Sequence, residues 1–420
     1  MKSFVRYSEL FGKTFRQPPK DESSRNAQLL EQAGFISKLM AGVYTYLPLG
    51  LRVLNAVKDV IRREMDALGA QEFYMPALQP KEIWEKTGRW KDLSDIMYQF
   101  PDHSGRQVGL AATHEEVITH IVKQRITSYK DLPLALYQIQ DKFRDEPRAK
   151  SGLIRGREFS MKDLYSFHAD EKDLDSFYNR VAASYLSIFS RLGLQALMIE
   201  AAGGSFTKRF SDEFQVISDA GEDRIIYCPS CHFAQNSEIA EQKAGGPCPK
   251  CHGSLSEKKG IEVGNIFKLG TKFSDSIGAT FTASDGSTHP LIMASYGIGP
   301  GRLVGTIVEV SNDAQGIIWP KSVTPFQIHL VQLSKGLEEK KKTERLVHDC
   351  LNAGLTILLD DRVASAGVKF KDADMVGITA RMVISTSNEN QLEVKIRNES
   401  ASKKMNASQA IEFVKNYYAE

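Results

Sequence analysis

The sequence contains few of the features that mark secreted or membrane proteins. Five cysteines among 420 residues argue against a disulfide framework of the kind that stabilises small secreted domains. No apolar run approaches the roughly 20 residues of a membrane-spanning helix. Residues 1–20 lack both the continuous apolar core and the small-residue cleavage site of a signal peptide. We therefore expect a cytoplasmic protein that does not associate with membranes.

A strong net charge is also missing. The 54 lysines and arginines nearly balance the 52 aspartates and glutamates, which leaves a formal net charge of +2. A nucleic-acid partner would therefore have to be met by a local patch rather than by the whole surface. The composition, 42% hydrophobic and 25% charged, is that of an ordinary folded protein, and the length predicts two or three domains.

The sequence has no repeats or low-complexity segments, but its pattern changes at residues 317–326, which hold two prolines and which we interpret as a linker. Beyond this stretch, strand-like runs alternate with helical runs, which is typical of a small α/β domain. The expected strands are 327–333, 355–361, 381–386 and 392–397, and the expected helices are 337–353, 367–376 and the C-terminal end. We predict one domain over residues 1–320 and a second over residues 321–420.

An arginine-rich stretch, FRDEPRAKSGLIRGREF (143–159), is the first candidate site. Alternation on both sides of it predicts an antiparallel hairpin with a long loop, and the polar face of this hairpin presents Arg144, Glu146, Arg155 and Phe159. Guanidinium groups bind phosphates through a planar fork, a phenylalanine can stack on a base, and a carboxylate can accept from an amine. These residues predict an ATP site, with a salt-bridged surface hairpin as the alternative.

Two shorter segments suggest ligand contacts. In GIGPGR (297–302), glycines let the backbone pass close to a ligand, and Arg302 at a helix start favours a nearby anion because it opposes the helix dipole. A tight turn is the alternative, since the spacing is not that of a phosphate-binding P-loop. In AATHEEV (111–117), Thr113 and Glu115 either cap a helix or hold an amino group.

Four of the five cysteines form two pairs, CPSC and CPKC, that are separated by sixteen residues. This spacing is within the range of a four-thiolate zinc site. We predict structural zinc at Cys228, Cys231, Cys248 and Cys251, with four reduced thiols as the alternative. Cys350 falls on the apolar side of its helix, so we expect it in the core.

Three basic residues in the last predicted domain, Arg362, Lys369 and Lys371, lie among aspartates in residues 360–377. Basic side chains on a small α/β module suit contacts to RNA. An ordinary solvated helix explains the same residues.

Taken in order, these segments resemble the class II aminoacyl-tRNA synthetases. The helix and strand of residues 50–78, the FRDE…RGREF hairpin and GIGPGR are similar to the three signature motifs of that class. The segments THEE, RGREFSMKDLYSFH, VGNIFKLGTKFS, SYGIGPGR and GVKFKDAD are similar to bacterial-type prolyl-tRNA synthetases, over essentially the whole chain. The resemblance implies an α+β catalytic domain, with an antiparallel sheet and flanking helices, followed by a C-terminal α/β anticodon-binding domain.

The resemblance also implies a role for each candidate residue. Arg144 and Arg302 would be catalytic, stabilising the charge that develops as the carboxylate of proline attacks the α-phosphorus of ATP. The implied ATP site consists of Arg144, Glu146, Arg155, Phe159 and Arg302. The implied proline site consists of Thr113, Glu115, Arg144, Met161, Phe214 and Ser295. The implied anticodon contacts are Arg362, Lys369 and Lys371.

The implied activity is formation of prolyl-adenylate from L-proline and ATP, with Mg²⁺ bridging the phosphates, followed by transfer to tRNA(Pro). Such enzymes work by positioning and charge stabilisation, without a covalent protein intermediate. The first motif implies a homodimer. A synthetase for another small amino acid and a catalytically silent tRNA-binding paralogue are the alternatives, and the intact arginines argue against the second.

Three departures from the family pattern qualify the resemblance. Many bacterial members carry a large editing insertion where this sequence has only the cysteine-rich segment, about residues 226–260. We therefore expect no editing of misacylated alanine in cis and a separate hydrolase for this task, because apolar pockets discriminate small analogues poorly. Residues 203–214 are longer than usual and place Asp212 where a histidine is usual, and Ser295 stands where some members have cysteine.

Overall fold

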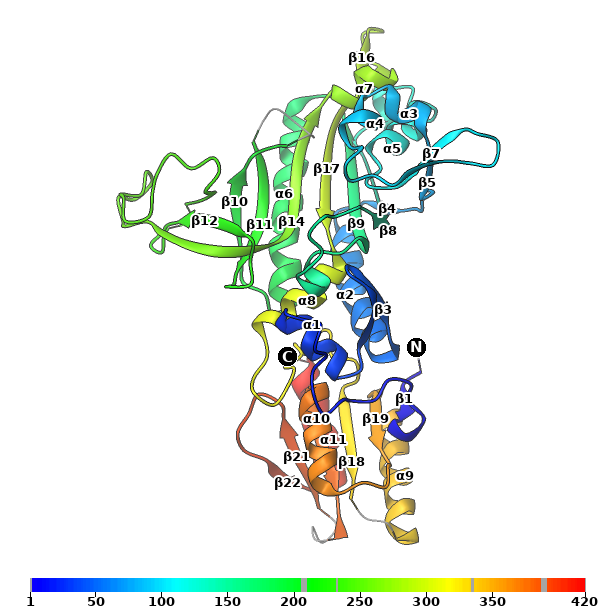
Figure 1. The fold of residues 1–420 in the computed structure, drawn as a ribbon, viewed down its shortest axis with the longest axis vertical. Coiled ribbons are helices and arrows are strands. Elements are labelled where there is room, and N and C mark those ends of the chain that lie inside the picture. The colour runs from blue at the N-terminus through cyan, green and yellow to red at the C-terminus, as the bar shows by residue number, and fades with distance from the viewer. Residues whose placement is uncertain (1, 205–209, 232, 334–335, 387–390, 420) are drawn as a thin grey trace. The chain divides into compact units, whose positions relative to one another are not determined.

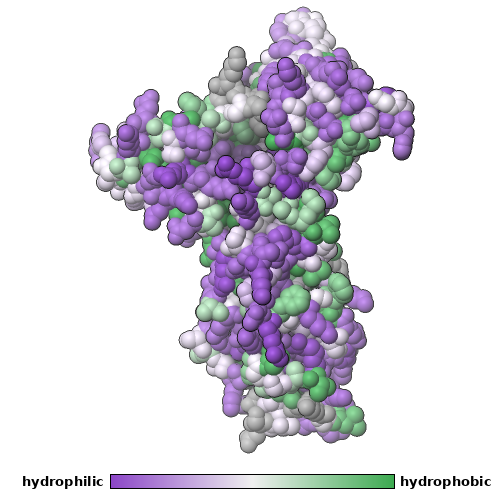
Figure 2. Space-filling view, viewed as in Figure 1, coloured by the Kyte–Doolittle hydropathy of each residue, from purple (hydrophilic) through white to green (hydrophobic). Residues whose placement is uncertain are grey.

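The structure, a computed structural model, describes residues 2–204, 210–231, 233–333, 336–386 and 391–419 (Figure 1). The chain forms two compact units. The larger unit contains residues 40–43 and 58–306, and the smaller unit contains residues 1–39, 44–57 and 307–420. None of the helices in the described ranges is both long and apolar enough to cross a membrane. The face in view in Figure 2 is mainly hydrophilic, with apolar residues scattered over it.

The larger unit is built on a nine-stranded sheet with the strand order β11-β10-β13-β12-β14-β17-β9-β8-β4, in which β11 also pairs with β14. All pairs are antiparallel except β4 with β8 and β10 with β13, which are parallel. The strands are β4 (Gln71–Glu72), β8 (Leu134–Phe143), β9 (Glu158–His168), β10 (Ala196–Ala201), β11 (Ser211–Ile217), β12 (Asp223–Tyr227), β13 (Ala234–Asn236), β14 (Ser256–Gly270) and β17 (Ile292–Ile298).

The predicted hairpin is confirmed as β8 and β9, which pair from Leu134 with Phe167 to Phe143 with Glu158. Alternation along β9 sends Phe159, Met161, Asp163 and Tyr165 to one face of the sheet and the residues between them to the other. The second face is covered by the long helix α6 (Glu171–Arg191), whose side chains Tyr178, Tyr185 and Phe189 are buried. The first face is therefore the one on which a ligand can bind, and we call it the open face.

A group of short elements in the larger unit joins one end of this sheet, as Figure 1 shows. A three-stranded sheet has the order β5-β7-β6, and β15 pairs with β16. The elements are β5 (Leu78–Pro80), α3 (Lys81–Glu85), α4 (Arg89–Asp92), β6 (Gln99–Pro101), β7 (Gln107–Leu110), α5 (Glu115–Lys123), η2 (Tyr129–Asp131), α7 (Lys272–Ile277), β15 (Thr280–Thr282) and β16 (Thr288–Pro290). The short helix η3 (Gly152–Ile154) lies in the β8–β9 loop. Helix α8 (Pro300–Val310) follows β17 after the glycines, as the sequence predicts.

The smaller unit contains a six-stranded sheet with the order β1-β19-β18-β20-β21-β22. Its strands are β1 (Phe4–Arg6), β18 (Ile328–Gln332), β19 (Ile357–Asp360), β20 (Ala380–Ile384), β21 (Leu392–Ile396) and β22 (Lys403–Met405). Its other elements are η1 (Tyr7–Glu9), α1 (Arg25–Gln32), β2 (Ile36–Met40), β3 (Val43–Tyr46), α2 (Pro48–Ala67), α9 (Leu337–Asn352), α10 (Ala366–Val376) and α11 (Ala407–Ala419), of which β2, β3 and α2 extend into the larger unit. The predicted α/β alternation is confirmed.

Two features of the smaller unit differ from expectation. The N-terminal strand β1 pairs in parallel with β19, although the two are separated by about 350 residues in sequence. The stretch that we interpreted as a linker, residues 317–326, is packed rather than free, because Ile317, Trp319, Val323 and Phe326 are all buried. The Trp319 indole N–H donates to the carbonyl of Val376 at 3.0 Å. The proline-containing stretch is therefore anchored by buried apolar side chains.

Candidate active site

A cavity lies on the open face between the β8–β9 loop, β14 and the start of α8. All five residues of the predicted ATP site line it: Arg144, Glu146, Arg155, Phe159 and Arg302. The hairpin and the glycine segment are far apart in sequence, so the fold is what brings these residues together. Glu262 of β14 lines the same cavity and was not predicted.

Arg144 enters this cavity at the end of β8. Its Nε donates to the carbonyl of Ala112 at 3.1 Å, and its guanidinium lies 5.3 Å from the centre of the Phe159 ring. Burial, followed by the positive charge of Arg302, lowers the pKa of Arg144. The positive charges of Arg144 and Arg302 repel each other, so this part of the cavity favours an anionic ligand near both groups.

Arg155 and Glu146 already form an ion pair in the cavity wall. Arg155 Nη2 and Nε lie 2.8 and 2.9 Å from Glu146 Oε2, and its Nη1 lies 2.5 Å from Glu222 Oε2. Arg157 Nε donates to the carbonyl of Glu146 at 3.0 Å. The hairpin is thus salt-bridged, as the alternative interpretation expected, and it also lines a cavity, so the two interpretations do not exclude each other.

Arg302 lies in the first turn of α8 and crosses to β14. Its Nη1 donates to the carboxylate of Glu262 at 2.8 Å and to the carbonyl of the same residue at 3.0 Å. A Cβ atom at Gly297 would lie 2.8 Å from Oδ1 of Asn265, which is closer than real Cβ contacts. The backbone at Gly297 therefore passes close to a side chain of the neighbouring strand β14, and its expected approach to a ligand stays a prediction.

A second cavity adjoins the first. The two share the lining residues Arg144, Met161, Glu262, Asn265, Gly297 and Arg302. Five of the six predicted proline-site residues line the second cavity: Thr113, Glu115, Arg144, Met161 and Ser295. The unpredicted lining residues include Asp163, Tyr165, Asn265, Phe267 and Tyr296. A lining that combines polar and aromatic side chains suits a small amphipathic ligand.

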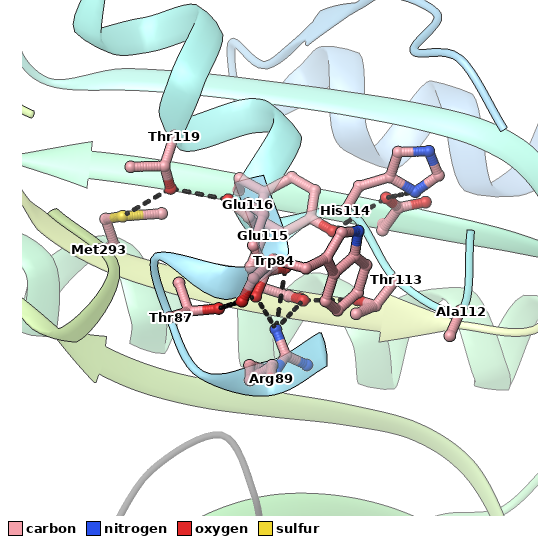
Figure 3. Close-up of polar contacts among 12 residues, drawn as sticks. Trp84, Thr87, Arg89, Ala112, Thr113, His114, Glu115, Glu116, Thr119 and Met293 are labelled. Carbon is pink, nitrogen blue, oxygen red and sulfur yellow. Dashed lines mark hydrogen bonds and ion pairs between the residues drawn. The ribbon is translucent and has the colours of Figure 1, made fainter. Parts of the chain in front are cut away.

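Thr113 and Glu115 lie at the N-terminus of α5, where Figure 3 shows them beside Arg89. Thr113 Oγ1 donates to Oε2 of Glu115 at 2.6 Å, and Arg89 Nη1 lies 3.1 Å from the same oxygen. Glu115 is only 3% exposed. The carboxylate is therefore held in place before any ligand arrives, which goes beyond the helix-capping role that explains the residue types.

Asp163 forms the centre of a buried polar cluster under the second cavity. Its carboxylate accepts from Lys142 Nζ at 2.8 Å, Gln138 Nε2 at 2.9 Å and Tyr165 Oη at 3.0 Å. Burial alone would raise the pKa of Asp163, but the Lys142 ammonium and His114 hold it below its usual value. Sequence alternation could have found this residue, since it shares a face of β9 with Phe159 and Met161.

His114 is packed against this cluster without exposure to solvent. Its Nε2 donates to the carbonyl of Pro76 at 3.1 Å, and its Nδ1 lies 3.8 Å from Oδ2 of Asp163. Burial, followed by the charge of Lys142, lowers the pKa of His114 to about 4. The ring is therefore neutral at physiological pH.

The buried His114 makes stability depend on pH. Between about pH 6.5 and 4 the unfolded chain binds a proton that the folded chain excludes, so the unfolding free energy falls as the pH falls through this window. The loss reaches about 3 kcal/mol below pH 4. We expect urea unfolding of His114→Gln to depend less on pH in this window than that of the unmodified protein. The exposed His103, changed to Gln, should leave the dependence unaltered, and equal slopes for both variants would contradict the prediction.

Phe214 is not at the cavity, and its assignment to the proline site is corrected here. The side chain is fully buried against Tyr185 and Phe189 of α6, with ring centroids 5.1 and 5.6 Å away. Alternation along β11 sends Phe214 to the covered face and Glu213 to the open face. Asp212 also faces α6, where it accepts from Tyr178 Oη at 2.7 Å. Residues 205–209 of the altered segment lie outside the described residues.

The four cysteines converge as the spacing predicts. Their sulfur atoms all lie within 4.8 Å of one another, with 3.4 Å between Cys228 and Cys251 and 3.6 Å between Cys231 and Cys248. Tetrahedral Zn–S bonds of about 2.3 Å would place the sulfurs about 3.8 Å apart. The donor set and spacing therefore fit zinc. Cys350 is buried in the core of the smaller unit, as expected.

The three basic residues of residues 360–377 differ in accessibility. Arg362 is largely occupied by Asp360 and Asp372, at 2.7 and 2.9 Å. Lys369 is only 3% exposed and donates to the carbonyls of Gln332 and Asp360. The proposed contact of Lys369 to RNA is therefore corrected to a structural role, because its ammonium binds backbone carbonyls at the C-terminal ends of β18 and β19.

Lys371 is exposed on the same helix, α10. Of the three basic residues, it is the one whose side chain is free to reach a polyanion. The sequence alone could not separate Lys369 from Lys371, because α10 carries a charge on both its buried and its exposed side.

Comparison with known proteins extends these observations. Residues 98–311 match the family model described as tRNA synthetase class II core domain (G, H, P, S and T), and residues 326–417 match an anticodon binding domain. The proline–tRNA ligase of Halothermothrix orenii is 32% identical over 98% of this chain and 99% of its own length. That of Bacillus cytotoxicus is 33% identical, over 96% and 98% respectively.

Solved structures agree at the level of the fold. A prolyl-tRNA synthetase from Cryptosporidium parvum, solved with L-proline and AMP, has a TM-score of 0.78 and 17% identity, and the match covers 96% of this chain and 77% of that one. The Giardia lamblia enzyme, solved with prolyl-adenylate, has a TM-score of 0.77 and 17% identity, over 93% and 78% of the two chains.

The antiparallel sheet with its two joined cavities and the match to the core domain define a class II aminoacyl-tRNA synthetase. The curated relatives align with nearly the whole of this chain at 32–33% identity. The chain belongs to the prolyl-tRNA synthetase family. The Halothermothrix alignment spans 561 positions against the 420 residues here, so at least 141 positions of that relative have no counterpart in this chain.

Proposed function

We propose that this chain activates L-proline with ATP to form prolyl-adenylate and transfers the prolyl group to tRNA(Pro), without editing in cis. The observation that carries the proposal is the pair of adjoining cavities with Arg144 in the wall of both. One cavity is lined by arginines, a carboxylate and a phenylalanine that suit a nucleotide, and the other has a carboxylate and a hydroxyl for an amino group. A shared arginine suits a reaction in which a carboxylate from one side attacks a phosphate from the other.

Each residue has a task in this mechanism. Glu115 and Thr113 hold the imino group of proline, while Met161 and Ser295 line the pocket around its ring. Arg144 orients the carboxylate of proline against the α-phosphate and stabilises the charge that develops there. Pyrophosphate leaves in line, with its charge held by Arg302 and Arg155.

The adenine lies between Phe159 and Arg302, with its amine toward Glu146. Ring stacking and cation–π attraction supply the binding energy. Glu146 and Arg155 form an ion pair at 2.8 Å in the ligand-free site. When ATP binds, Glu146 also contacts the adenine amine and Arg155 also contacts a phosphate. The residues of the ion pair are therefore held close to where the nucleotide needs them.

We assign the Mg²⁺ ion to two carboxylates at or near the nucleotide cavity. Glu262 accepts from Asn265 Nδ2 at 2.8 Å and lines the cavity with it. Glu213 lies on the neighbouring strand, and burial followed by the charge of Glu262 raises its pKa to about 7. Two carboxylates that oppose each other's ionisation form a suitable site for a divalent cation. Glu262 and Glu213 would hold the ion, which when bound neutralises phosphate charge.

Structural Zn²⁺ at the four cysteines is a second proposed metal. The knuckle around Cys248 is supported by the backbone N–H of Lys250, which donates to the Cys248 sulfur at 3.4 Å. Among the described residues, the buried cluster around the site consists of Ile226, Phe233 and Leu255 besides cysteines. So small a core rarely holds a segment together without a metal.

The remaining assignments concern organisation and partners. We assign catalysis to residues 1–320 and anticodon binding to residues 321–420, with Lys371 and, less directly, Arg362 as the basic contacts. The exposed large side chains of Phe11, Leu39 and Tyr74, each 74–76% exposed, support a homodimer that covers them. The protein is cytoplasmic in this proposal, and a separate hydrolase clears alanyl-tRNA(Pro).

Amino-acid-dependent ATP–pyrophosphate exchange tests the proposed function. We expect strong exchange with proline, weaker exchange with alanine, and little with cysteine or threonine. The alanine rate measures how much editing a separate enzyme has to supply. Exchange with another amino acid in place of proline would contradict the substrate, and no exchange with any of them would favour the catalytically silent paralogue.

A further inference from the structure

Arg89 lies behind the amino-group end of the second cavity and does not line it. It begins the short helix α4, which is separated from Glu115 by β6, β7 and their loops. Its side chain is 1% exposed, and those of Glu115 and Glu116 are 4% and 0% exposed. A buried arginine with two buried carboxylates is costly to desolvate, so its presence at this place needs a reason.

One nitrogen of Arg89 joins the two carboxylates. Nη1 lies 3.1 Å from Oε2 of Glu115 and 3.0 Å from Oε1 of Glu116, as Figure 3 shows. Thr113 donates to the same Oε2 of Glu115. Within the described part of the chain, both side-chain hydrogen bonds of Glu115 therefore fall on Oε2, which leaves Oε1 to accept from a bound amine.

Two aromatic rings lie close to the guanidinium of Arg89. Its Cζ lies 5.4 Å from the centre of the Trp84 ring and 5.2 Å from that of Phe273. Trp84 is itself held by a hydrogen bond from its indole N–H to Gln79 at 2.9 Å. Gln79 in turn donates to the carbonyl of Thr113 at 3.3 Å. This chain of hydrogen bonds therefore connects Trp84 with the residue that lies beside Glu115 in the second cavity.

Glu116 is the second carboxylate that contacts Arg89. It accepts from Thr87 Oγ1 at 2.8 Å as well as from Arg89. Burial raises the pKa of Glu116, against the opposing effect of Arg89.

We infer that Arg89 is a positioning residue for the amino group of the substrate: it fixes Oε2 of Glu115 so that Oε1 faces the cavity. The inference rests on the proposed function, in which Glu115 binds the imino group of proline. Arg89 does not touch the substrate in this arrangement. Its guanidinium lies near the rings of Trp84 and Phe273, with Nη1 in contact with both carboxylates. The compact ammonium of a lysine does not reproduce the planar guanidinium that packs against these rings.

The experiment compares Arg89→Met and Arg89→Lys with the unmodified protein in proline-dependent ATP–pyrophosphate exchange. Arg89→Met should raise the KM for proline at least tenfold, while kcat and the KM for ATP stay within threefold, because the lost interaction is made equally in the ground and transition states. Arg89→Lys, which keeps the buried charge, should raise the KM for proline about fivefold. Calorimetric titration of proline without ATP should show the same order of affinities.

Arg106→Met is the matched control. Arg106 lies in the same part of the chain, its side chain is 77% exposed and it pairs with Asp102, so its loss should leave all three parameters unchanged. The lysine variant keeps the test decisive if the methionine variant does not fold. A KM for proline within twofold of the unmodified value in Arg89→Lys, or equal rises in both KM values, would overturn the inference.

The two levels of the proposal fail in different ways. If the unmodified protein shows no proline-dependent exchange, the proposed function fails and the role of Arg89 fails with it. If the unmodified protein exchanges normally and the Arg89 variants match it, the function stands and only the role of Arg89 is overturned.

Discussion

Arg144→Ala is expected to abolish adenylate formation while the fold stays intact. The guanidinium lies in the wall of both cavities, where the carboxylate of proline meets the α-phosphate. Loss of one donor aimed at developing charge costs about 10²- to 10³-fold in kcat, and Arg144 serves two reacting groups, so we expect about a thousand-fold loss in kcat/KM. Proline-dependent pyrophosphate exchange measures it.

The structural cost of this change should be small. Among the described residues, the Arg144 side chain makes one hydrogen bond, to the carbonyl of Ala112, which is worth about 1 kcal/mol. Thermal unfolding should therefore shift little. Arg148→Ala is the control, since Arg148 lies exposed in the same loop and should leave exchange within twofold. Near-normal exchange by Arg144→Ala would refute the role of this residue.

The sequence predicted the hairpin and the smaller unit well because both depend on local pattern. Alternation along 133–146 and 158–161 is a property of neighbouring residues, and the observed pairing of β8 with β9 follows it residue by residue. The cysteine cluster was predictable for a similar reason, since the spacing of the two pairs nearly determines how they meet. None of these required knowledge of which distant segments pack together.

Long-range packing explains what was missed. Arg89 and Asp163 carry no motif, and only the tertiary fold brings Arg89 to Glu115, 26 residues away. The strand β1 joins β19 from the other end of the chain. Residues 317–326 look like a linker by proline content, yet four apolar side chains anchor them.

The two corrections share a physical cause. Phe214 and Lys369 have residue types that suit a ligand site, but each points to the covered side of its element. For Phe214, alternation along β11 shows only that Phe214 and Glu213 lie on opposite faces of the sheet. Which of these faces α6 covers depends on the tertiary fold. For Lys369, two backbone carbonyls compete with any RNA for the ammonium. Residue type alone does not decide which side of an element a residue occupies.

Removal of zinc from the four-cysteine segment is expected to unfold residues 228–255 locally. The purified protein should carry about one zinc per chain by elemental analysis, because four thiolates form one tetrahedral site. The apolar cluster here is small, so a zinc ion at the four cysteines would supply most of the local stability. Treatment with a strong chelator should therefore expose the segment to limited proteolysis, while the nine-stranded sheet stays protected.

Cysteine variants separate the metal from a general effect of thiol loss. Cys248→Ser should lower the zinc content to near zero and make the segment protease-sensitive without chelator, because Cys248 is fully buried at the centre of the cluster. Cys350→Ala removes the fifth thiol, in the core of the smaller unit, and should keep one zinc per chain. A metal-free preparation whose segment resists protease equally would instead favour four reduced thiols, held by packing and hydrogen bonds alone. Because pyrophosphate exchange depends on the open face of the sheet, chelation should reduce exchange far less than it reduces the stability of this segment.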